Sequence, residues 1–365
     1  MKKILIIHPS MVGGGAEKVL INMLNSFDYN KYDVTLLSLI DEGINKKFIN
    51  KNVKYRYVFK KHIKGYRHFL KLFSPKFLFK KMVKDKYDTI ISYLEGPTTR
   101  ILSGCNYKTN LISWIHTENT TCFKIAFRSK KEMIKAYNRI NKIVCVSSDV
   151  KKSFSNFTEG LFDSKTTVIK NVNNPDDIIK KSKEACDELN SNSFNIIAIG
   201  RLDNNKDHAR LIPIIEKLNS ERLDAKLFIL GMGEEFNNIK QKIEEYDMGK
   251  KVKLMGYQVN PYKFLAKADL YVCCSHYEGY STTTIESLIL NIPILTTNCS
   301  GMKEILDNGK YGIIVDDNDE EIYENIKEII KDKNKYTKLK LNQKEKISLL
   351  YEEYDSIVNE INSIL

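Results

Sequence analysis

Short apolar strands alternate with helical stretches along almost the whole chain, and the alternation runs through it twice. Buried strands that are separated by helices pair in parallel, with the helices as crossovers. The pattern therefore predicts an α/β fold of two doubly wound, Rossmann-like domains facing a central cleft. The strands expected in the two halves are residues 4–8, 34–40, 89–94, 111–116, 143–147 and 167–170, then 195–200, 226–230, 251–255, 270–274, 292–296 and 312–315.

The division between the halves falls where the chain turns polar. With 365 residues and 42% hydrophobic content, the chain is large enough for two cores. We expect an N-terminal domain over residues 1–172, a linker over 173–194 and a C-terminal domain over 195–335. A closing helix over 336–365 is expected to pack back toward the N-terminal domain.

Basic residues are concentrated in one segment. Residues 51–86 contain thirteen Lys or Arg and a single acid, Asp85, so the segment carries +12, equal to the net charge of the whole chain. Large apolar residues are interleaved with these cations. This mixture favours an anionic membrane surface. A solvated basic face and a nucleic-acid surface are the alternatives, and nucleic acid is not expected as a partner.

The sequence predicts a cytoplasmic protein, peripheral at the cytoplasmic face of the membrane. The first apolar run covers only residues 4–7, and no run reaches the roughly 18 residues that a spanning helix needs. The seven cysteines form no CxxC pair and are interpreted as reduced core residues. No metal site is predicted, since the only DxD-like string, residues 317–319, precedes a helix for which Asp319 would be the N-cap.

A glycine run, Gly13-Gly14-Gly15, follows the first predicted strand and opens the first helix. Glycines there let a ligand approach the backbone, and the helix N-terminus offers free N–H groups to an anion. A dinucleotide fingerprint would place a third glycine where Lys18 stands, so a nicotinamide enzyme is disfavoured.

Strand ends in the second half carry further candidates. Arg201 and Lys206 follow its first strand and suit a diphosphate, because Arg offers a planar fork of donors and Lys a mobile charge. Gly231 and Gly233 allow a tight turn near a phosphate or base, and Tyr257 is placed to stack on a nucleobase. The alternative interpretations are a pair of surface cations, ordinary glycine turns between strand and helix, and a tyrosine that packs on its own domain.

The most informative piece is the stretch from Ser275 to Glu286. A strand ends, Glu278 lies in a polar loop, and Ser281 is the expected N-cap of a helix that begins at Thr282. Thr282 and Thr283 would then present backbone N–H groups to a phosphate. Glu286, one turn later on the side of Thr282, is placed to accept from both hydroxyls of a ribose.

With these motifs in order along the chain, the sequence resembles the GT-B fold glycosyltransferases of family 4 (glycosyl transferases group 1), of the bacterial surface-polysaccharide type. The resemblance rests on GGGAEK, the GRL…K pair, LGMGE, MGY and EGYSTTTIE, which opens with Glu278 and ends with Glu286. It departs from the commoner pattern at Gly279-Tyr280-Ser281, where a more apolar loop is usual, and this leaves the donor sugar open.

The resemblance implies roles for individual residues. Arg201 and Lys206 would hold the diphosphate, Glu286 the ribose and Glu278 the donor sugar. Ser281, Thr282 and Thr283 would form the phosphate end of the helix, and Gly14 and Gly15 would approach the donor from the other domain. His116, after the strand LISWIH, matches a histidine that lies near the donor sugar in this family, the alternative being a buried core histidine.

The implied reaction is transfer of a sugar, with retention, from a nucleotide-sugar such as a UDP-sugar to a glycan or polyprenyl-linked glycan. No cofactor would be required. The acceptor candidates are Glu95, Thr98 and Thr99 in the loop YLEGPTTR at 93–100, and Glu118 in the segment 117–121. Two alternatives stay open: a nucleotide-sugar epimerase of the same fold, and a non-enzymatic binder of anionic lipid or nucleic acid.

Overall fold

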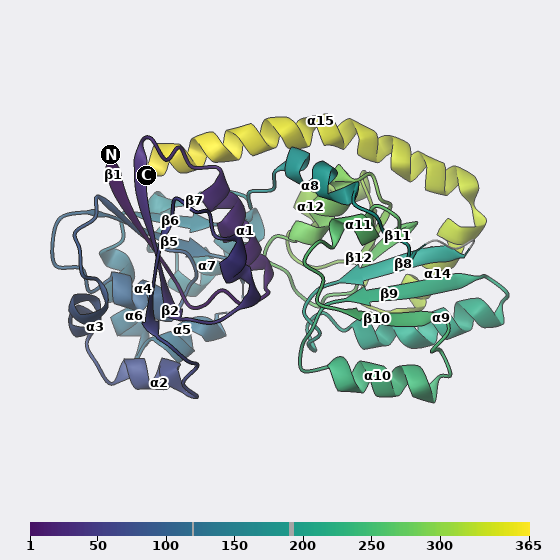
Figure 1. Cartoon of the computed structure of the whole chain (residues 1–365), viewed down its shortest axis with the longest axis horizontal. Helices are drawn as coiled ribbons and strands as arrows, with labels where there is room; N and C mark the ends of the chain where they lie inside the picture. Colours follow the sequence, from purple (N-terminus) through teal and green to yellow (C-terminus); the bar gives the residue numbers. More distant parts are fainter. Residues whose placement is uncertain (119, 190–192) are drawn as a thin grey trace. The chain divides into compact units, whose positions relative to one another are not determined.

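The computed structural model describes residues 1–118, 120–189 and 193–365. The chain divides into two units, Met1–Val172 with Ser356–Leu365, and Asn173–Asp355. Each unit holds a parallel sheet with helices around it (Figure 1). None of the helices in the described ranges is long and apolar enough to cross a membrane.

In the first unit, the described residues form a seven-stranded parallel sheet of order β3-β2-β1-β4-β5-β6-β7. Strand β1 pairs with β2 from Lys2 opposite Tyr32 to His8 opposite Ser38. The edge strand β3 was missed by the sequence prediction, because none of its residues is fully buried and they form no continuous apolar run. The strands are β1 (Lys2–His8), β2 (Tyr32–Ile40), β3 (Lys54–Phe59), β4 (Thr89–Ser92), β5 (Asn110–Ile115), β6 (Lys142–Cys145) and β7 (Thr166–Val168).

Helices connect these strands, as the crossovers of a parallel sheet require. Helix α1 connects β1 to β2, and α6 precedes β6. The helical segments of this unit are α1 (Gly15–Asn25), η1 (Ile44–Phe48), α2 (Tyr66–Lys71), α3 (Pro75–Met82), α4 (Pro97–Leu102), α5 (Thr121–Ala126), α6 (Lys130–Asn138), α7 (Ser148–Thr158) and η2 (Asp163–Lys165).

The last residues of the chain also belong to the first unit. They are the end of the long helix α15 (Lys333–Ile364) and Leu365. Thr89 Oγ1 donates a 2.5 Å hydrogen bond to the backbone oxygen of Leu365, and Asn110 Nδ2 donates one of 2.8 Å to that of Ile364. Because Thr89 and Asn110 begin β4 and β5, these bonds fix the chain end to the amino edge of the sheet.

The second unit repeats the architecture, and each strand predicted for it is present. Across its described residues the sheet is six-stranded and parallel, of order β10-β9-β8-β11-β12-β13. The order reverses between β8 and β11, and such a switch point is where open α/β sheets bind ligands. The strands are β8 (Phe194–Ile199), β9 (Ala225–Leu230), β10 (Val252–Gly256), β11 (Leu270–Cys273), β12 (Ile294–Thr297) and β13 (Ile313–Val315).

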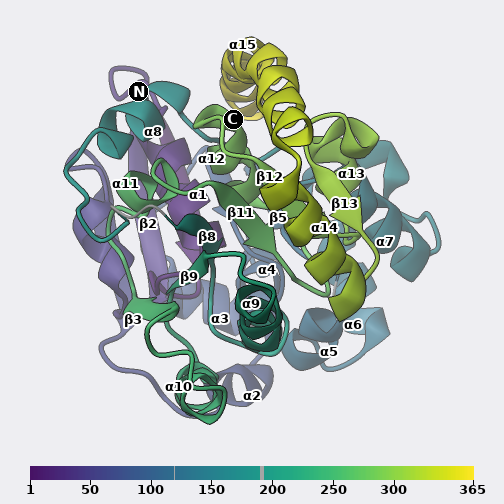
Figure 2. The same cartoon turned by 90° about the vertical axis from the view of Figure 1, so that its right-hand side faces the viewer.

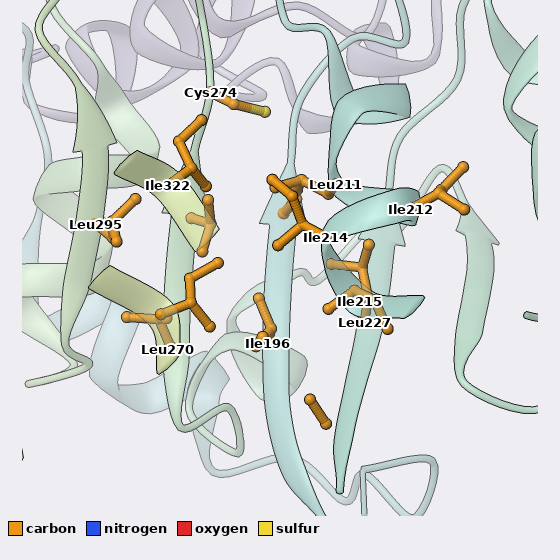
Figure 3. Close-up of a cluster of buried hydrophobic side chains, with 14 of the residues drawn as sticks. Ile196, Leu211, Ile212, Ile214, Ile215, Leu227, Leu270, Cys274, Leu295 and Ile322 are labelled. Atoms are coloured by element: carbon orange, nitrogen blue, oxygen red, sulfur yellow. The ribbon is translucent and has the colours of Figure 1, made fainter. Parts of the chain in front are cut away.

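One core of this unit lies between the sheet and α9, α10 and α14 (Figure 3). Alternate strand residues face it, such as Ile196 and Ala198 of β8, as the two-residue period of a strand requires. Helices α8, α11 and α12 cover the other face (Figure 2). The helical segments are α8 (Pro175–Ser182), η3 (His208–Arg210), α9 (Leu211–Ser220), α10 (Phe236–Glu245), α11 (Tyr262–Leu265), α12 (Thr282–Ile289), α13 (Met302–Ile305), η4 (Asp307–Gly309) and α14 (Asp319–Lys331), followed by α15.

The cap of α14 differs from the prediction. Asn318, not Asp319, is the N-cap, and its side chain accepts hydrogen bonds from the N–H groups of Glu320 and Glu321. Asp319 is the first helical residue and pairs with Arg210, as does Asp317. The carboxylates of the DxD-like string therefore hold the start of α14 to η3.

Candidate donor and acceptor sites

The switch point of the second unit brings together two of the predicted site residues. Lys206 follows β8 and Glu278 follows β11, and Lys206 Nζ forms an ion pair with Glu278 Oε1. Ser275 Oγ donates a 2.8 Å hydrogen bond to the same oxygen. The two side chains are 23% and 12% exposed, so the pair is partly withdrawn from water.

Lys206 remains a cation in this setting. Burial alone lowers the pKa of its ammonium group, but the neighbouring charge of Glu278 raises it, and the net pKa is above its ordinary value. A positive charge is therefore maintained at the carboxyl edge of the sheet throughout the neutral pH range.

Arg201 lies on the same edge but outside that pair. Its side chain is exposed, and no carboxylate in the described ranges forms an ion pair with it. The structure thus separates the two predicted cations: Lys206 is engaged by Glu278, whereas the Arg201 guanidinium can turn toward an anion.

Gly231 and Gly233 have a packing role that the sequence did not reveal. A Cβ on Gly231, whose φ is +150°, would lie 1.8 Å from the carbonyl oxygen of Gly200. A Cβ on Gly233 would lie 2.1 Å from that of Leu202. The Leu202 N–H also donates to the Met232 carbonyl at 3.1 Å. The glycines thus let the loop after β9 support the backbone that carries Arg201.

Helix α12 begins as expected. Ser281 is its N-cap and accepts from the Thr284 N–H at 3.4 Å and from the Thr284 hydroxyl at 2.9 Å. The first N–H groups of a helix have no partner within it, so those of Thr282 and Thr283 lie at its positive end. The structure places this helix end directly after the Glu278 loop.

Glu286 is almost fully enclosed by the protein. The residue is 1% exposed, and the Tyr262 hydroxyl of α11 lies 3.4 Å from Glu286 Oε1. Burial and the charge of Glu286 together raise the pKa of Tyr262. Tyr262 is a partner that sequence reasoning missed, since nothing in the sequence relates α11 to α12. Tyr257, at the end of β10, is half-buried.

A second cluster lies at the carboxyl ends of β1, β4 and β5 in the first unit. The ring centroids of His116 and Tyr93 are 4.9 Å apart, and those of His8 and Tyr93 are 6.2 Å apart. His8 Nδ1 donates a 2.7 Å hydrogen bond to the carbonyl oxygen of Ser10. In the part of the chain that the structure describes, the Nε2 atoms of His8 and His116 are buried without a hydrogen-bond partner.

Burial sets the protonation of this cluster. It lowers the pKa of His8 to about 4, and with the proximity of His8 it lowers that of His116 to about 3. Both rings are therefore neutral at physiological pH. Burial raises the pKa of Glu95 to about 7. Sequence reasoning selected His116 but missed His8, although His8 also follows a buried strand.

The other candidate residues of the first unit are the glycines of the first loop and Glu118. Gly14 is the N-cap of α1 and Gly15 its first residue, as the loop motif implies. Glu118 is half-buried, and its pKa is raised, chiefly by burial. The rest of its segment includes Asn119, which lies outside the described residues.

The hydroxyls of Thr98 and Thr99, two of the predicted acceptor residues, have partners within the protein. Both are fully buried in α4. Thr98 Oγ1 donates to the Leu94 carbonyl at 2.5 Å, and Thr99 Oγ1 lies 3.2 Å from Ser113 Oγ. In this structure both hydroxyls join α4 to the sheet, and their contact with an acceptor stays a prediction.

Known proteins resemble this chain over both units. The family model described as Glycosyl transferases group 1 matches residues 180–346. An uncharacterized glycosyltransferase of Methanocaldococcus jannaschii is 32% identical over 228 residues, so the match spans 56% of each chain, just over half the length of that relative. A Campylobacter jejuni protein is 28% identical over 342 residues, 91% of each chain. It is named N-acetylgalactosamine-N,N'-diacetylbacillosaminyl-diphospho-undecaprenol 4-alpha-N-acetylgalactosaminyltransferase.

Solved structures share the fold along the whole chain. Anabaena HepE in complex with UDP and glucose has a TM-score of 0.78 at 18% identity and covers 100% of both chains. A glycosyltransferase from Rickettsia africae has a TM-score of 0.76 at 18% identity, covering 100% of this chain and 97% of that one. At this identity the likeness establishes the GT-B type of fold and no more.

Proposed function

Because residues 180–346 match the family model of the glycosyl transferases of group 1, we propose that this chain belongs to that family and moves a sugar from a UDP-sugar to a lipid-linked glycan, with retention of the anomeric configuration. The observation that carries the proposal is the meeting of Lys206 and Glu278 at the switch point of the second unit, beside the N-terminus of α12. The site combines a cation and a helix end suited to a diphosphate with a carboxylate suited to sugar hydroxyls.

The donor is assigned to the second unit. Arg201, Lys206 and the first N–H groups of α12 would bind the diphosphate, in place of a metal ion. Glu286 would accept from the ribose hydroxyls and Glu278 from those of the sugar. The UDP complex of HepE supports UDP as the nucleotide.

The acceptor is assigned to the first unit. The Campylobacter relative is named for a diphospho-undecaprenol acceptor, which supports a lipid-linked glycan here. Glu95 is the polar group best placed for it, at the end of β4, and His116, at the end of β5, would lie near the sugar that is transferred. Since His116 is neutral, it would act as a hydrogen-bonding group and not as a cation.

In the proposed reaction, the bond between the anomeric carbon and the diphosphate oxygen breaks, and its electron pair leaves with UDP. The acceptor oxygen then bonds the anomeric carbon from the same face, and its proton passes to the departing phosphate oxygen. Arg201 and Lys206 would stabilise the negative charge that develops on UDP.

The test is a transfer assay. The purified full chain is incubated with UDP-sugars, with and without a polyprenyl-diphosphate-linked glycan. UDP release and a product heavier by one sugar are expected only with acceptor, and Arg201→Ala and Glu286→Ala should abolish both. Conversion of the donor to its epimer without acceptor would favour the epimerase instead. Unchanged activity of both variants would contradict the assignment of the site.

We propose further that the first unit docks on an anionic membrane through α2 and α3. Phe69, Leu72 and Phe77 are 46%, 73% and 45% exposed. Phe73 lies between two of them, with its ring centroid 5.2 Å from those of Phe69 and Phe77. These residues form an apolar surface patch within the basic segment 51–86. Apolar side chains surrounded by lysines suit the interface of a negatively charged bilayer.

A further inference from the structure

One side chain joins the two loops that carry Lys206 and Glu278. Asn205 immediately precedes Lys206, and Tyr277 immediately precedes Glu278. Asn205 Oδ1 accepts from the Tyr277 N–H at 3.1 Å, and Asn205 Nδ2 donates to the Tyr277 carbonyl at 3.0 Å. The carbonyl oxygen of Asn205 also accepts from the His276 N–H at 2.9 Å.

The chemistry of these bonds is specific for an amide. Asn205 satisfies both backbone groups of Tyr277 at once, as a neighbouring strand would. Only a side chain with a donor and an acceptor on the same carbon can do this. Asp would lose the donor and place a negative charge against the Tyr277 carbonyl, and Ala would lose both bonds.

The position of the bonds relates them to the donor site. They act on the residues directly before the ion-paired Lys206 and Glu278, whose side chains belong to loops after different strands. A loop displaced by about 1 Å can cost on the order of a hundredfold in rate when it carries a group that touches the substrate.

We infer that Asn205 is a positioning residue, which sets the register of the two loops so that Lys206 and Glu278 meet the donor together. The inference rests on the proposed function for its effect on catalysis. The hydrogen bonds of Asn205 to Tyr277 lie within the second unit. If Asn205 had only a structural role, its substitution would lower stability, and the loss of kcat/KM would not depend on whether Glu278 is present.

The experiment compares Asn205→Ala and Asn205→Asp with the neighbouring control Asn204→Ala, whose side chain is exposed. Donor kcat/KM is measured in the wild-type and Glu278→Gln backgrounds. We expect Asn205→Ala to lower kcat/KM by about 10- to 100-fold in the wild-type background and by less than about 3-fold in the Glu278→Gln background. We expect Asn205→Asp to lower kcat/KM in the same pattern across the two backgrounds. Equal losses in both backgrounds, or none, would overturn the inference.

A second measurement does not depend on turnover. The rate at which a water-soluble, amine-reactive acetylating reagent modifies Lys206 is followed by peptide mass spectrometry. Release of the loops should raise this rate at least about threefold in Asn205→Ala and leave it unchanged in Asn204→Ala. If the wild-type chain turns over no donor, the proposed function fails, and this rate decides the inference. An unchanged rate in Asn205→Ala would refute it.

Discussion

The backbone N–H of His116 donates a 2.9 Å hydrogen bond to Glu95 Oε2. This bond joins the ends of β4 and β5 at the carboxyl edge of the first sheet. The carboxyl group that accepts it is only 6% exposed, and burial raises its pKa from 4.5 to about 7. A titratable group with such a pKa makes the stability of this unit depend on pH.

Glu95→Gln should remove part of that pH dependence. The folded-state pKa of Glu95 is raised, so the native state binds more protons than the unfolded state between pH 4.5 and about 7, and stability falls as pH rises through this window. Gln keeps an acceptor for His116 but does not ionise. Urea titration gives the free energy of unfolding of each protein. The value for Glu95→Gln minus the value for wild type should rise by up to about 3 kcal/mol from pH 4.5 to 8. Parallel pH curves would contradict this expectation.

Lys206→Ala should impair the proposed reaction strongly. The substitution removes the cation at the switch point and leaves Glu278 without its ionic partner. We expect kcat for UDP release to fall by about 10²–10³-fold. Lys267→Ala is the matched control, because Lys267 is exposed just before the amino end of β11, at the opposite edge of the same sheet. Similar rates for both variants would exclude Lys206 from the donor site.

Gly231→Ala should destabilise the second unit. The new methyl group would collide with the Gly200 carbonyl, and the φ of +150° is unfavourable for alanine. A loss of more than about 2 kcal/mol in the free energy of unfolding is expected by denaturant titration. Gly249→Ala is the control, since its Cβ would have nothing within 4 Å. Equal stability of the two variants would show that the loop relaxes at no cost.

Arg100→Ala should loosen the segment that carries the apolar surface patch. The Arg100 side chain is 1% exposed, pairs with Glu132 at 2.8 Å, and donates to the carbonyls of Leu70 and Phe73 at 2.9 and 2.7 Å. A loss of about 3–5 kcal/mol in the free energy of unfolding is expected, because the partly buried Glu132 carboxylate and both carbonyl groups lose a partner. Hydrogen exchange should accelerate in α2. If the α2 amides of Arg100→Ala were as well protected from exchange as those of the exposed control Arg67→Ala, Arg100 would not hold this segment.

The double variant Leu72→Glu/Phe77→Glu should weaken binding to anionic vesicles. It replaces two exposed apolar side chains by charges that the lipid repels. In co-sedimentation with phosphatidylglycerol-containing vesicles, we expect at least about a tenfold loss of partitioning. Leu161→Glu, on an exposed leucine of the same unit, is the control. Wild-type binding by the double variant, or equal binding to neutral vesicles by the wild type, would contradict membrane docking through this patch.

Much of the fold was readable because buried parallel strands need continuous apolar runs. This is why the strands of the second unit were all predicted. Strand β3 was not, because its hydrogen bonds to β2 are backbone bonds that leave no apolar pattern in a strand exposed at the sheet edge. The N-cap of α14 was misplaced by one residue, since Asn318 and Asp319 are both good caps and only the backbone conformation distinguishes them.

The meeting of candidate residues at one edge of the second sheet could be predicted from the sequence, but their bonds could not. Lys206, Glu278 and Ser281 could be selected because each follows a strand, and strand ends of a doubly wound sheet gather at one edge. Thr98 and Thr99 also follow a strand, yet they face inward, because α4 packs them against Ser92 and Ser113. Sequence spacing does not show which way a short helix faces.

The sequence by itself determined the strand and helix alternation, the resemblance to a family and the types of residue at the strand ends, because these depend on local pattern and order. Only the tertiary structure decided that Lys206 pairs with Glu278, that Asn205 holds Tyr277, and that burial keeps His116 neutral. The physical reason is that ion pairing, hydrogen bonding and desolvation depend on distances between groups far apart in the chain, and the folding of the sheet sets those distances.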